Sequence, residues 1–373
     1  MVRFEHRIID PETPWTHNSV CLIADIDGDG CNDVLIGAFK GEGNIVWYEY
    51  PDWKRHTIGT GTLEAGGIVL DINGNGRLDF VAGCLQGPDL YWFENSGDPE
   101  KEWTRRVICS DFFNYHNQAF GDIDGDGERE IVIPSQGRGK GNGNLFYYDI
   151  PADPTVSPWP AERRHFIWRG LVLEGVAVAD VDGDGEMEVV AGSHWFKRRG
   201  EARGGAEKPG GPEAAGGATA PFGWECRVVD ESYRLLCVAV GDIDGDGRPE
   251  IVMSEGESHP ARLAWFGNAP RFDQEHVLAD DLFHPHSLAL ADFTGSGRLD
   301  IFVAEMGLTN HPGKPKLMIY ENLGGGRFER HVISRGIPTH SAQVGDIGRT
   351  GRPSIVGKPW FPEHHVDLWL NLG

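Results

Sequence analysis

A nine-residue acidic motif recurs seven times along the chain and carries its densest metal-ligand chemistry. The first copy reads Asp-Ile-Asp-Gly-Asp-Gly-Cys-Asn-Asp, with carboxylates at positions one, three, five and nine. Hard divalent cations bind several oxygen ligands, and the glycines let the backbone wrap around an ion. The copies occupy residues 25–33, 71–79, 122–130, 180–188, 242–250, 292–300 and 346–354.

We predict structural calcium in copies one, three, four and five, which keep an acidic residue at all four positions. Copy two has Asn73 and Asn75 and is expected to bind more weakly, while copies six and seven have lost ligands. The alternative is a loop without an ion, in which the side chains accept backbone N–H groups. The candidate ligands are Asp25, Asp27, Asp29, Asp33, Asp71, Asn73, Asn75, Asp79, Asp122, Asp124, Asp126, Glu130, Asp180, Asp182, Asp184, Glu188, Asp242, Asp244, Asp246 and Glu250.

The motif begins like an EF-hand loop but does not end like one. Position twelve of an EF-hand is a bidentate Glu, whereas copies one and three have Ile36 and Ile133 there. The flanking segments also have the composition of strands rather than helices. EF-hand calcium sensing is therefore excluded.

Each copy lies between two short apolar segments, which we expect to be the first two strands of a four-stranded unit. Residues 176–179 (Val-Ala-Val-Ala) precede copy four, and their small side chains suit a crowded innermost strand. An aromatic third segment such as 45–49 and a polar, alternating fourth segment such as 53–58 follow. Seven such units with a period of tens of residues predict an all-β, seven-bladed propeller of four-stranded antiparallel blades.

The fourth strand of the last unit is missing after residue 354, and a matching segment stands at residues 4–9 instead. We expect this N-terminal strand to complete the last blade, which closes the ring and removes free sheet edges. Residues 1–373 then form one domain. Residues 197–223 are rich in Gly, Ala and charge, and we predict a flexible insertion in blade four, with a lid over a site as the alternative.

The start of each first strand and the end of each second strand lie on the face opposite the acidic loops. Several kinds of polar group gather at these positions, and their convergence near the axis predicts a ligand or catalytic site. Those before first strands are His17, Asn18, Glu64, Tyr115, His116, Asn117, Glu174, His284, His286 and His340. Those after second strands are Gln86, Gln136, Arg138, His194, Trp195, Glu255, His259, Glu305, His311, Lys358 and Trp360.

Two chemistries fit this funnel. Imidazoles with a carboxylate bind divalent metals, and we assign that role to His194, His286 and Glu174. His or Tyr can also exchange protons with a substrate while a cation stabilises an enolate or uronate. The candidate acid–base pair is His116 with Tyr115 or His340. The candidate substrate contacts are Lys358, Arg138, Trp195, Trp360, Glu255 and His259, with Lys358 and Arg138 neutralising charge.

The repeated DxDGDGxx[DE] motif resembles the FG-GAP/VCBS family of β-propellers along the whole chain. The segments YHNQAFGDIDGDG, AGSHWF and FHPHSLALADF further resemble the propeller of the aldos-2-ulose (1,5-anhydro-D-fructose) dehydratases. That resemblance implies loss of water from a keto sugar after proton abstraction beside the carbonyl. No cupin domains follow the repeats as they do in the fungal dehydratase, so the expectation does not extend to a second, isomerising step.

The composition argues against several other classes of function and partner. The formal net charge is −23, which disfavours nucleic acid and anionic membranes as partners. The six cysteines are scattered without metal-type pairs, and no signal peptide or membrane span is recognisable, so we expect a cytoplasmic location. No GxSxG, phosphate-loop or dinucleotide motif is present.

These observations predict a carbon–oxygen lyase acting by β-elimination, either a dehydratase of keto or anhydro sugars or a lyase of uronate-containing saccharides. The expected partner is a small sugar or an oligosaccharide. One alternative is a non-catalytic propeller that binds saccharide or protein. Another is a glycoside hydrolase, which needs two carboxylates at a set separation, with Glu174, Glu255 and Glu305 as candidates.

Overall fold

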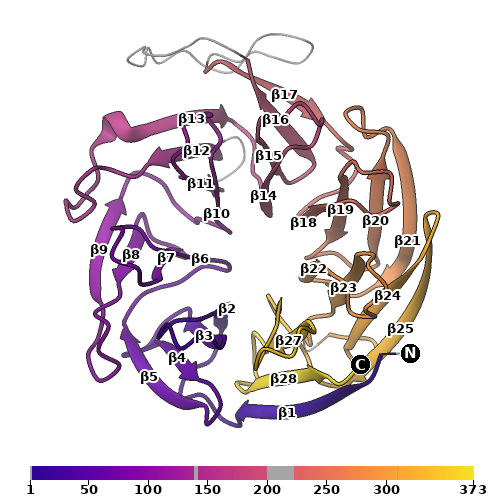
Figure 1. The fold of residues 1–373 in the computed structure, drawn as a ribbon, viewed down its shortest axis with the longest axis horizontal. Coiled ribbons are helices and arrows are strands. Elements are labelled where there is room, and N and C mark those ends of the chain that lie inside the picture. Colours follow the sequence, from indigo (N-terminus) through magenta and orange to yellow (C-terminus); the bar gives the residue numbers. More distant parts are fainter. Residues whose placement is uncertain (1, 138–141, 200–221, 309) are drawn as a thin grey trace.

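The structure is a computed structural model that describes residues 2–137, 142–199, 222–308 and 310–373. Figure 1 shows these residues as a ring of blades around a common axis. There are seven sheets of four strands, and every strand pairing within them is antiparallel. The predicted fold class, an all-β seven-bladed propeller, is therefore confirmed.

The chain runs outward from the axis through each blade and then crosses to the innermost strand of the next blade. Blades one to three contain β2 (Asn18–Ala24), β3 (Asp33–Ala38), β4 (Ile45–Glu49), β5 (Lys54–Gly59), β6 (Ile68–Leu70), β7 (Asp79–Gly83), β8 (Leu90–Glu94), β9 (Thr104–Cys109), β10 (Ala119–Gly121), β11 (Glu130–Ser135), β12 (Asn144–Asp149) and β13 (Arg164–Arg169). A short 3-10 helix, η1 (Ala161–Arg163), precedes β13. Blades four to seven contain β14 (Val176–Ala179), β15 (Glu188–Ala191), β16 (His194–Arg198), β17 (Trp224–Val228), β18 (Leu236–Gly241), β19 (Glu250–Glu255), β20 (Ala261–Gly267), β21 (Gln274–Leu282), β22 (Ser287–Ala291), β23 (Asp300–Ala304), β24 (Lys316–Gly324), β25 (Arg327–Arg335), β26 (Gln343–Gly345), β27 (Ser354–Gly357), β28 (Val366–Asn371) and β1 (Phe4–Asp10).

In blades one, two and six, a buried carboxylate at position nine of the motif joins three strands of the blade. In blade one, Asp33 opens β3 and accepts hydrogen bonds from Ile26 N (3.0 Å) in the acidic loop and Tyr50 N (2.9 Å) after β4. Asp79 does the same in blade two and Asp300 in blade six. Unpaired backbone N–H groups are costly when buried, so this carboxylate fixes how the loop and the third strand sit on the second.

Aromatic third strands fill the spaces between blades. Trp47 of blade one packs in one cluster with Phe80 and Phe93 of blade two, and Trp195 of blade four packs with Phe266 of blade five. Each of these side chains is almost fully buried. The aromatic stripes are therefore inter-blade core, as expected for large apolar side chains between closely packed sheets.

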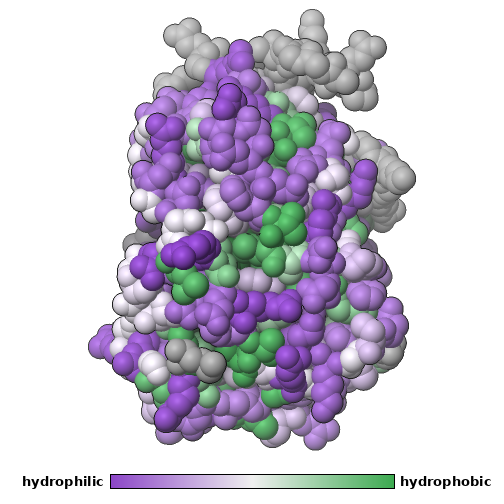
Figure 2. Space-filling model, turned by 90° about the vertical axis from the view of Figure 1, so that its right-hand side faces the viewer, coloured by the Kyte–Doolittle hydropathy of each residue, from purple (hydrophilic) through white to green (hydrophobic). Residues whose placement is uncertain are grey.

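The outer strands face solvent on one side. The strand β21 is mostly exposed and has two buried residues, and β25 has only exposed and half-buried residues. Figure 2 shows the rim of the propeller edge-on, with a mainly hydrophilic surface broken by separate hydrophobic areas. The polar alternation that the sequence has in these segments thus belongs to the exposed edge of each blade.

The N-terminal strand closes the ring. The strand β1 pairs with β28 from Phe4 opposite Asn371 to Asp10 opposite Val366. His6 Nε2 lies 2.7 Å from Asp367 Oδ1, and Leu372 N donates to Arg3 O (2.8 Å). Figure 1 shows both termini side by side at the rim. The predicted completion of the last blade is confirmed.

The insertion in blade four begins later than the sequence suggested. Lys197 and Arg198 belong to β16, which pairs with β17 as far as Trp224, and Arg199 N donates to Gly223 O (2.9 Å). The predicted boundary at 197 was therefore wrong by two residues, because the strand continues into the charged segment. The rest of the predicted insertion, 200–221, lies outside the described residues.

The six cysteines are all free thiols, consistent with a fold that is not built on disulfides. In the described part of the chain, no helix has the length and apolar character needed to cross a membrane.

Removal of residues 1–10 tests the closure. It strips β28 of its outer neighbour and exposes its backbone groups, so we expect the melting temperature to fall by at least about 5 °C and self-association to increase. Differential scanning calorimetry and light scattering measure both effects. Removal of residues 1–3, which leaves β1 intact, should change the melting temperature much less; equal effects of the two truncations would contradict the assignment.

Candidate functional site

Six buried ionisable residues converge at the axis, on the face opposite the acidic loops, and we call them the axial cluster. Each stands just before an innermost strand or, in one case, just after a second strand. Antiparallel blades place all these strand ends on the same face of the ring, which explains why residues far apart in sequence meet. The cluster consists of Glu64, His116, Glu174, His286, His340 and Lys358.

Three histidines of the cluster form a row. The rings of His116 and His286 lie 5.7 Å apart between centroids at an interplanar angle of 61°, and His286 stacks on His340 at 4.4 Å and 19°. Trp360 covers the far side of His340 at 5.0 Å. Each histidine is less than 9% exposed. Buried imidazoles this close cannot all be positively charged, because like charges repel strongly in a poorly solvated site.

Lys358 supports the end of the row. Its side chain is fully buried, and its Nζ contacts Asn18 O, Ser19 O (3.0 Å) and His340 Nδ1 (3.0 Å). Burial lowers the pKa of Lys358 to about 7. When the ammonium form donates to Nδ1, the proton of the neutral His340 ring is on Nε2. All three donors of Lys358 are then used inside the protein, so its position suits orienting His340 rather than touching a ligand.

His116 differs electrostatically from its two neighbours. Burial lowers its pKa, but the nearby carboxylates of Glu174, Glu64 and Glu257 together raise it above the usual value. By contrast, burial and the charge of His116 lower the pKa of His286 to about 3, and burial and Lys358 lower the pKa of His340. The row therefore holds one basic imidazole and two that stay neutral.

The tautomer of His116 is set by its neighbour Asn117. His116 Nδ1 lies 2.5 Å from Asn117 Oδ1, which also accepts a hydrogen bond from Gly175 N (3.3 Å). Because Oδ1 accepts, Nδ1 donates, and the lone pair of a neutral His116 lies on Nε2. The free nitrogen is thus the one that can take up a proton.

The carboxylates beside His116 are themselves perturbed. Burial raises the pKa of Glu174 to about 7, although His116 acts in the opposite direction, and burial also raises the pKa of Glu64. Glu174 accepts a hydrogen bond from Gln136 Nε2, and Glu64 accepts one from Ala65 N (2.9 Å). The site therefore contains a carboxyl group with a pKa of about 7 beside an imidazole whose pKa is raised.

Two predicted site residues point away from the axis, and these assignments were wrong. Tyr115 is fully buried between blades two and three, and its hydroxyl donates to Pro88 O (2.5 Å). Trp195 is fully buried between blades four and five. Successive side chains of an extended segment point to opposite sides, so when His116 faces the axis, Tyr115 enters the core. Neither has surface left for a substrate.

The other predicted residues take different positions. Trp360 lines the axial cluster, whereas Glu255 is held by two bonds from Arg262 (3.0 Å each). His194 contacts Ser193 and Phe196 within its own blade. His259 lines a pocket between blades five and six that is described below. Arg138 lies outside the described residues.

The predicted funnel metal set does not come together. In the described part of the chain, the groups of His, Cys, Asp and Glu ligand atoms within 4.8 Å of one another all belong to the acidic loops. His286 and Glu174 both lie near His116, but His194 does not join them. We therefore retain no metal role for His194, His286 and Glu174.

The acidic loops of blades one, three, four and five do bring their carboxylates together. The loops also fold through their own hydrogen bonds, for example from Gly28 N and Gly30 N to Asp25 (2.9 Å each). The residues grouped in this way are Asp25, Asp27 and Asp29; Asp122, Asp124 and Glu130; Asp180, Asp182 and Glu188; and Asp242, Asp244 and Asp246.

Loop four already contains a cation from the protein. Lys197 Nζ lies 2.6 Å from Asp182 Oδ2, 2.5 Å from Asp184 Oδ2 and 3.4 Å from Glu188 Oε1. Asp182 Oδ1 and Glu188 Oε1 are buried and accept no hydrogen bond, so Glu188 Oε1 meets Lys197 as an ion pair alone. The donor set fits a hard cation, and in this loop an ammonium takes that place.

Residues 25–82, 71–133 and 242–303 match the FG-GAP-like repeat. The chain carries FG-GAP-like repeats. Aldos-2-ulose dehydratase of Phanerodontia chrysosporium is 30% identical over 133 residues, which are 29% of this chain and 15% of that protein. Cartilage acidic protein 1 of Mus musculus is 30% identical over 148 residues, 35% of this chain and 22% of that protein. The matched regions thus span less than a quarter of either relative. Among solved structures, luciferin-regenerating enzyme aligns over 99% of this chain and 96% of its own, with 10% identity and a TM-score of 0.48.

Sequence reasoning missed Glu257 as a member of the electrostatic environment of His116. It follows the second strand of blade five, and its Oε1 lies 4.0 Å from His286 Nε2. The signal was present, because Glu257 stands between Glu255 and His259 in a segment already singled out.

Glu174→Gln tests the electrostatic origin of the basic His116. The amide keeps the shape of the side chain and removes its charge, so the imidazolium loses an attractive partner. We expect the pKa of His116 to fall by about one unit, read from its ring proton shifts in an NMR titration. Glu231→Gln, which removes a charge near His194, should leave it unchanged. A steady or higher pKa in Glu174→Gln would refute the pairing.

Proposed function

We propose that this protein is a carbohydrate-active carbon–oxygen lyase that acts by β-elimination at the axial cluster. The observation that carries the proposal is the division of the histidine row into one basic ring, His116, and two neutral rings, His286 and His340. Neighbouring groups whose environments push their pKa values apart are typical of acid–base catalysis. The substrate is a keto or anhydro sugar, or a saccharide that contains a uronate.

His116 acts as the base. Its Nε2 accepts the proton on the carbon beside the substrate carbonyl or carboxylate, and the imidazolium that forms is stabilised by the charges of Glu64 and Glu257. Asn117 holds Nδ1 and so keeps Nε2 directed at the substrate. The sequence predicted His116 as one member of an acid–base pair. The proposal adds the carboxylates that make His116 basic.

The neutral rings stabilise the charge that develops on the substrate. As the C–H bond breaks, negative charge moves to the carbonyl oxygen, and a neutral imidazole can donate its N–H to that oxygen. His340 is the better placed of the two, because Lys358 directs its proton to Nε2. Lys358 thereby has a positioning role in place of the direct charge neutralisation expected from the sequence.

Glu174 completes the elimination. The new C=C bond forms as the C–O bond at the β-carbon breaks, and the leaving oxygen takes a proton from the Glu174 carboxyl group. A carboxyl group with a pKa of about 7 is protonated often enough near neutrality to serve as this acid. Proton transfer from His116 back to Glu174, directly or through the released water, restores the site.

The partial similarity to aldos-2-ulose dehydratase supports a sugar substrate and loss of water. A glycoside hydrolase remains the alternative that a specific observation favours, because Glu64 and Glu174 are two buried carboxylates on either side of His116 in sequence and both influence its pKa. The two reactions differ in their products, since hydrolysis gives no C=C bond.

His116→Ala tests the proposed base. We expect the rate at which the unsaturated sugar forms, measured from its ultraviolet absorbance, to fall by about a hundredfold to ten-thousandfold, because the proton acceptor is gone. The matched control is His331→Gln, which changes a histidine paired with Glu321 on an outer strand and should retain wild-type turnover. Wild-type turnover in His116→Ala would refute the mechanism, and saturable binding without any product in the wild type would favour a binding propeller.

We also propose that loops one, three and five bind structural calcium. Their clustered carboxylates fit a hard cation, and binding would remove part of the charge repulsion in an acidic protein. Loop two has Asn73 and Asn75 in place of acids and should bind more weakly. Loop four differs from its predicted role, since Lys197 already neutralises it.

Calcium titration of metal-free protein tests this division. We expect Asp122→Ala to remove one tight site and Lys197→Met to add one, because the loop-four carboxylates then lack a cation. Saturating calcium should also raise the melting temperature, since a ligand that binds only the folded state stabilises it by about 2.7 kcal/mol at a hundredfold excess over Kd. Isothermal titration calorimetry counts the sites. Four equivalent sites in the wild type, unaffected by Lys197→Met, would contradict the proposal.

A further inference from the structure

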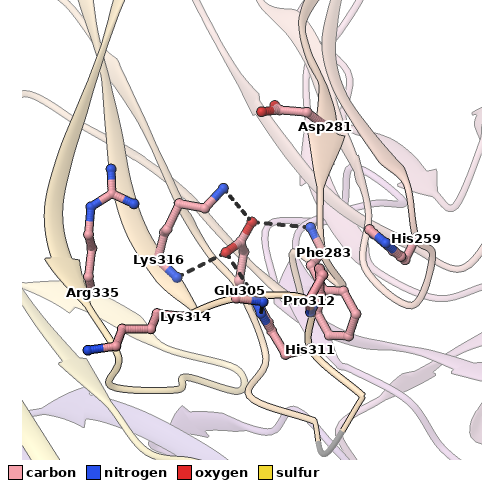
Figure 3. A pocket seen from close by; sticks show the side chains of 10 residues that line it. His259, Asp281, Phe283, Glu305, His311, Pro312, Lys314, Lys316 and Arg335 are labelled. Atoms are coloured by element: carbon pink, nitrogen blue, oxygen red, sulfur yellow. Dashed lines mark hydrogen bonds and ion pairs between the residues drawn. The ribbon is translucent and has the colours of Figure 1, made fainter.

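A pocket opens on the same face as the axial cluster, between blades five and six. It has a volume of about 430 Å³, and we call it the peripheral pocket. Figure 3 shows its side chains, with Glu305 in the centre and basic side chains on one rim. The charged and ring-bearing residues that matter for its chemistry are His259, Glu305, His311, Lys314, Lys316 and Arg335.

The one fully buried acid of this group is already satisfied. Glu305 accepts hydrogen bonds from Phe283 N (3.2 Å) and Lys316 N (3.0 Å). Its carboxylate also lies 3.4 Å from His311 Nε2 and 3.2 Å from Lys316 Nζ. With four donors around it, Glu305 has no capacity left to neutralise the remaining cations.

The other acid that lines the pocket is engaged elsewhere. Asp281 pairs with Arg330 at 2.9 Å, and Arg330 is not one of the lining residues. No ion pair within the described residues joins either Lys314 or Arg335, two further lining residues. The pocket therefore holds uncompensated positive charge in a protein whose net charge is −23.

The strand register brings the basic residues of the pocket together. Lys316 of β24 stands directly opposite Arg335 of β25, and Lys314 lies beside the turn that follows Arg335, with its Cδ 3.6 Å from where a Cβ on Gly336 would stand. Like charges directly opposite each other on paired strands are destabilising. Lys316 is paired with Glu305, whereas Lys314 and Arg335 are exposed and have no ion-pair partner among the described residues, so an anion at this rim would meet two available cations.

The peripheral pocket lies close to the axial cluster along the chain. Phe283, which packs between the rings of His259 (4.9 Å) and His311 (4.3 Å), is three residues from His286, a separation of at most about 10 Å along the chain. Glu305 O accepts a hydrogen bond from Thr339 N (3.2 Å), and His340 follows Thr339. A ligand that reaches both sites needs to span only a short distance across one face.

We propose that the peripheral pocket binds an anionic substituent, a carboxylate or a sulfate, of an acidic saccharide whose reacting sugar lies at the axial cluster. That the ligand is a saccharide rests on the proposed function. That the ligand is anionic rests on the basic residues of the pocket itself. It narrows the substrate to chains with a negative group one or a few sugars from the reacting bond. Lys314 and Arg335 are the principal contacts of the anionic group. The charge of Lys316 adds to the positive potential around that group.

Binding measured without turnover separates this proposal from the mechanism. The His116→Ala protein is titrated by calorimetry with a galacturonate trimer, sulfated maltotriose and maltotriose. We expect the anionic ligand that fits to bind at least about tenfold more tightly than maltotriose and to lose that advantage as the salt concentration rises. Preference for the galacturonate trimer identifies a carboxylate site, and preference for sulfated maltotriose identifies a sulfate site.

The double variant Lys314→Gln/Arg335→Gln locates the contact. In the His116→Ala background it should weaken binding of the anionic trisaccharide about tenfold, leave maltotriose unaffected and keep or slightly raise the melting temperature, because repulsion opposite Lys316 is removed. Arg327→Gln is the matched control, since Arg327 lies at the other end of the same strand. Its binding should equal that of the parent protein.

Equal affinity for anionic and neutral trisaccharides, or unchanged binding in the double variant, would overturn the proposal. The mechanism is tested separately by wild-type turnover of a neutral keto sugar, which has no group for the peripheral pocket. Elimination from that sugar without selective anion binding would leave the mechanism standing and refute the pocket. Selective, salt-sensitive binding without elimination from any saccharide would do the reverse.

Discussion

The buried carboxylate at position nine of the acidic motif is the contact on which the geometry of a blade depends. Asp33 in blade one accepts N–H groups from the loop before its strand and from the chain after the third strand. It therefore ties together three segments that side-chain packing alone would allow to slide. Asp79 and Asp300 make the same contacts in blades two and six, and fixing that end of a blade also fixes the opposite ends of its first and second strands, where the candidate site lies. Hydrogen bonds on one face of the ring therefore help to position the candidate site on the other face.

The axial cluster illustrates how one residue type acquires two roles from its surroundings. His116, His286 and His340 are all buried and stand at equivalent positions in their blades. Carboxylates surround the first, whereas the third has the lysine ammonium and the second lies between two other rings. In a poorly solvated site these neighbours decide which ring holds a proton. Burial alone would have made all three neutral, so the carboxylates of Glu64 and Glu174 are needed to make the difference.

The repeat allowed the blade number, the strand order, the closing strand and the face of the site to be predicted from sequence. It could do so because a strand period and a turn motif recur in every blade, which makes equivalent positions recognisable. Side-chain direction was less accessible. Tyr115 was grouped with His116 because they are adjacent, although adjacency in an extended segment places them on opposite sides. Lys358 was expected to meet a substrate, whereas it contacts carbonyl groups some 340 positions away in sequence, at Asn18 and Ser19. The basic rim of Lys314, Lys316 and Arg335 depends on the register of two strands, which the sequence does not specify.

The closing strand also determines where a tag, a surface or another protein can be attached to the molecule. Because β1 enters blade seven at the end where β28 leaves it, the two termini meet at the rim on the side of the acidic loops. A tag, a surface anchor or a fused protein attached at either terminus would therefore leave the axial cluster and the peripheral pocket facing outward. The same proximity means that a short linker could connect the termini and new ends could be opened in a loop between blades. The propeller is thus suited to circular permutation and to oriented immobilisation with its candidate site accessible.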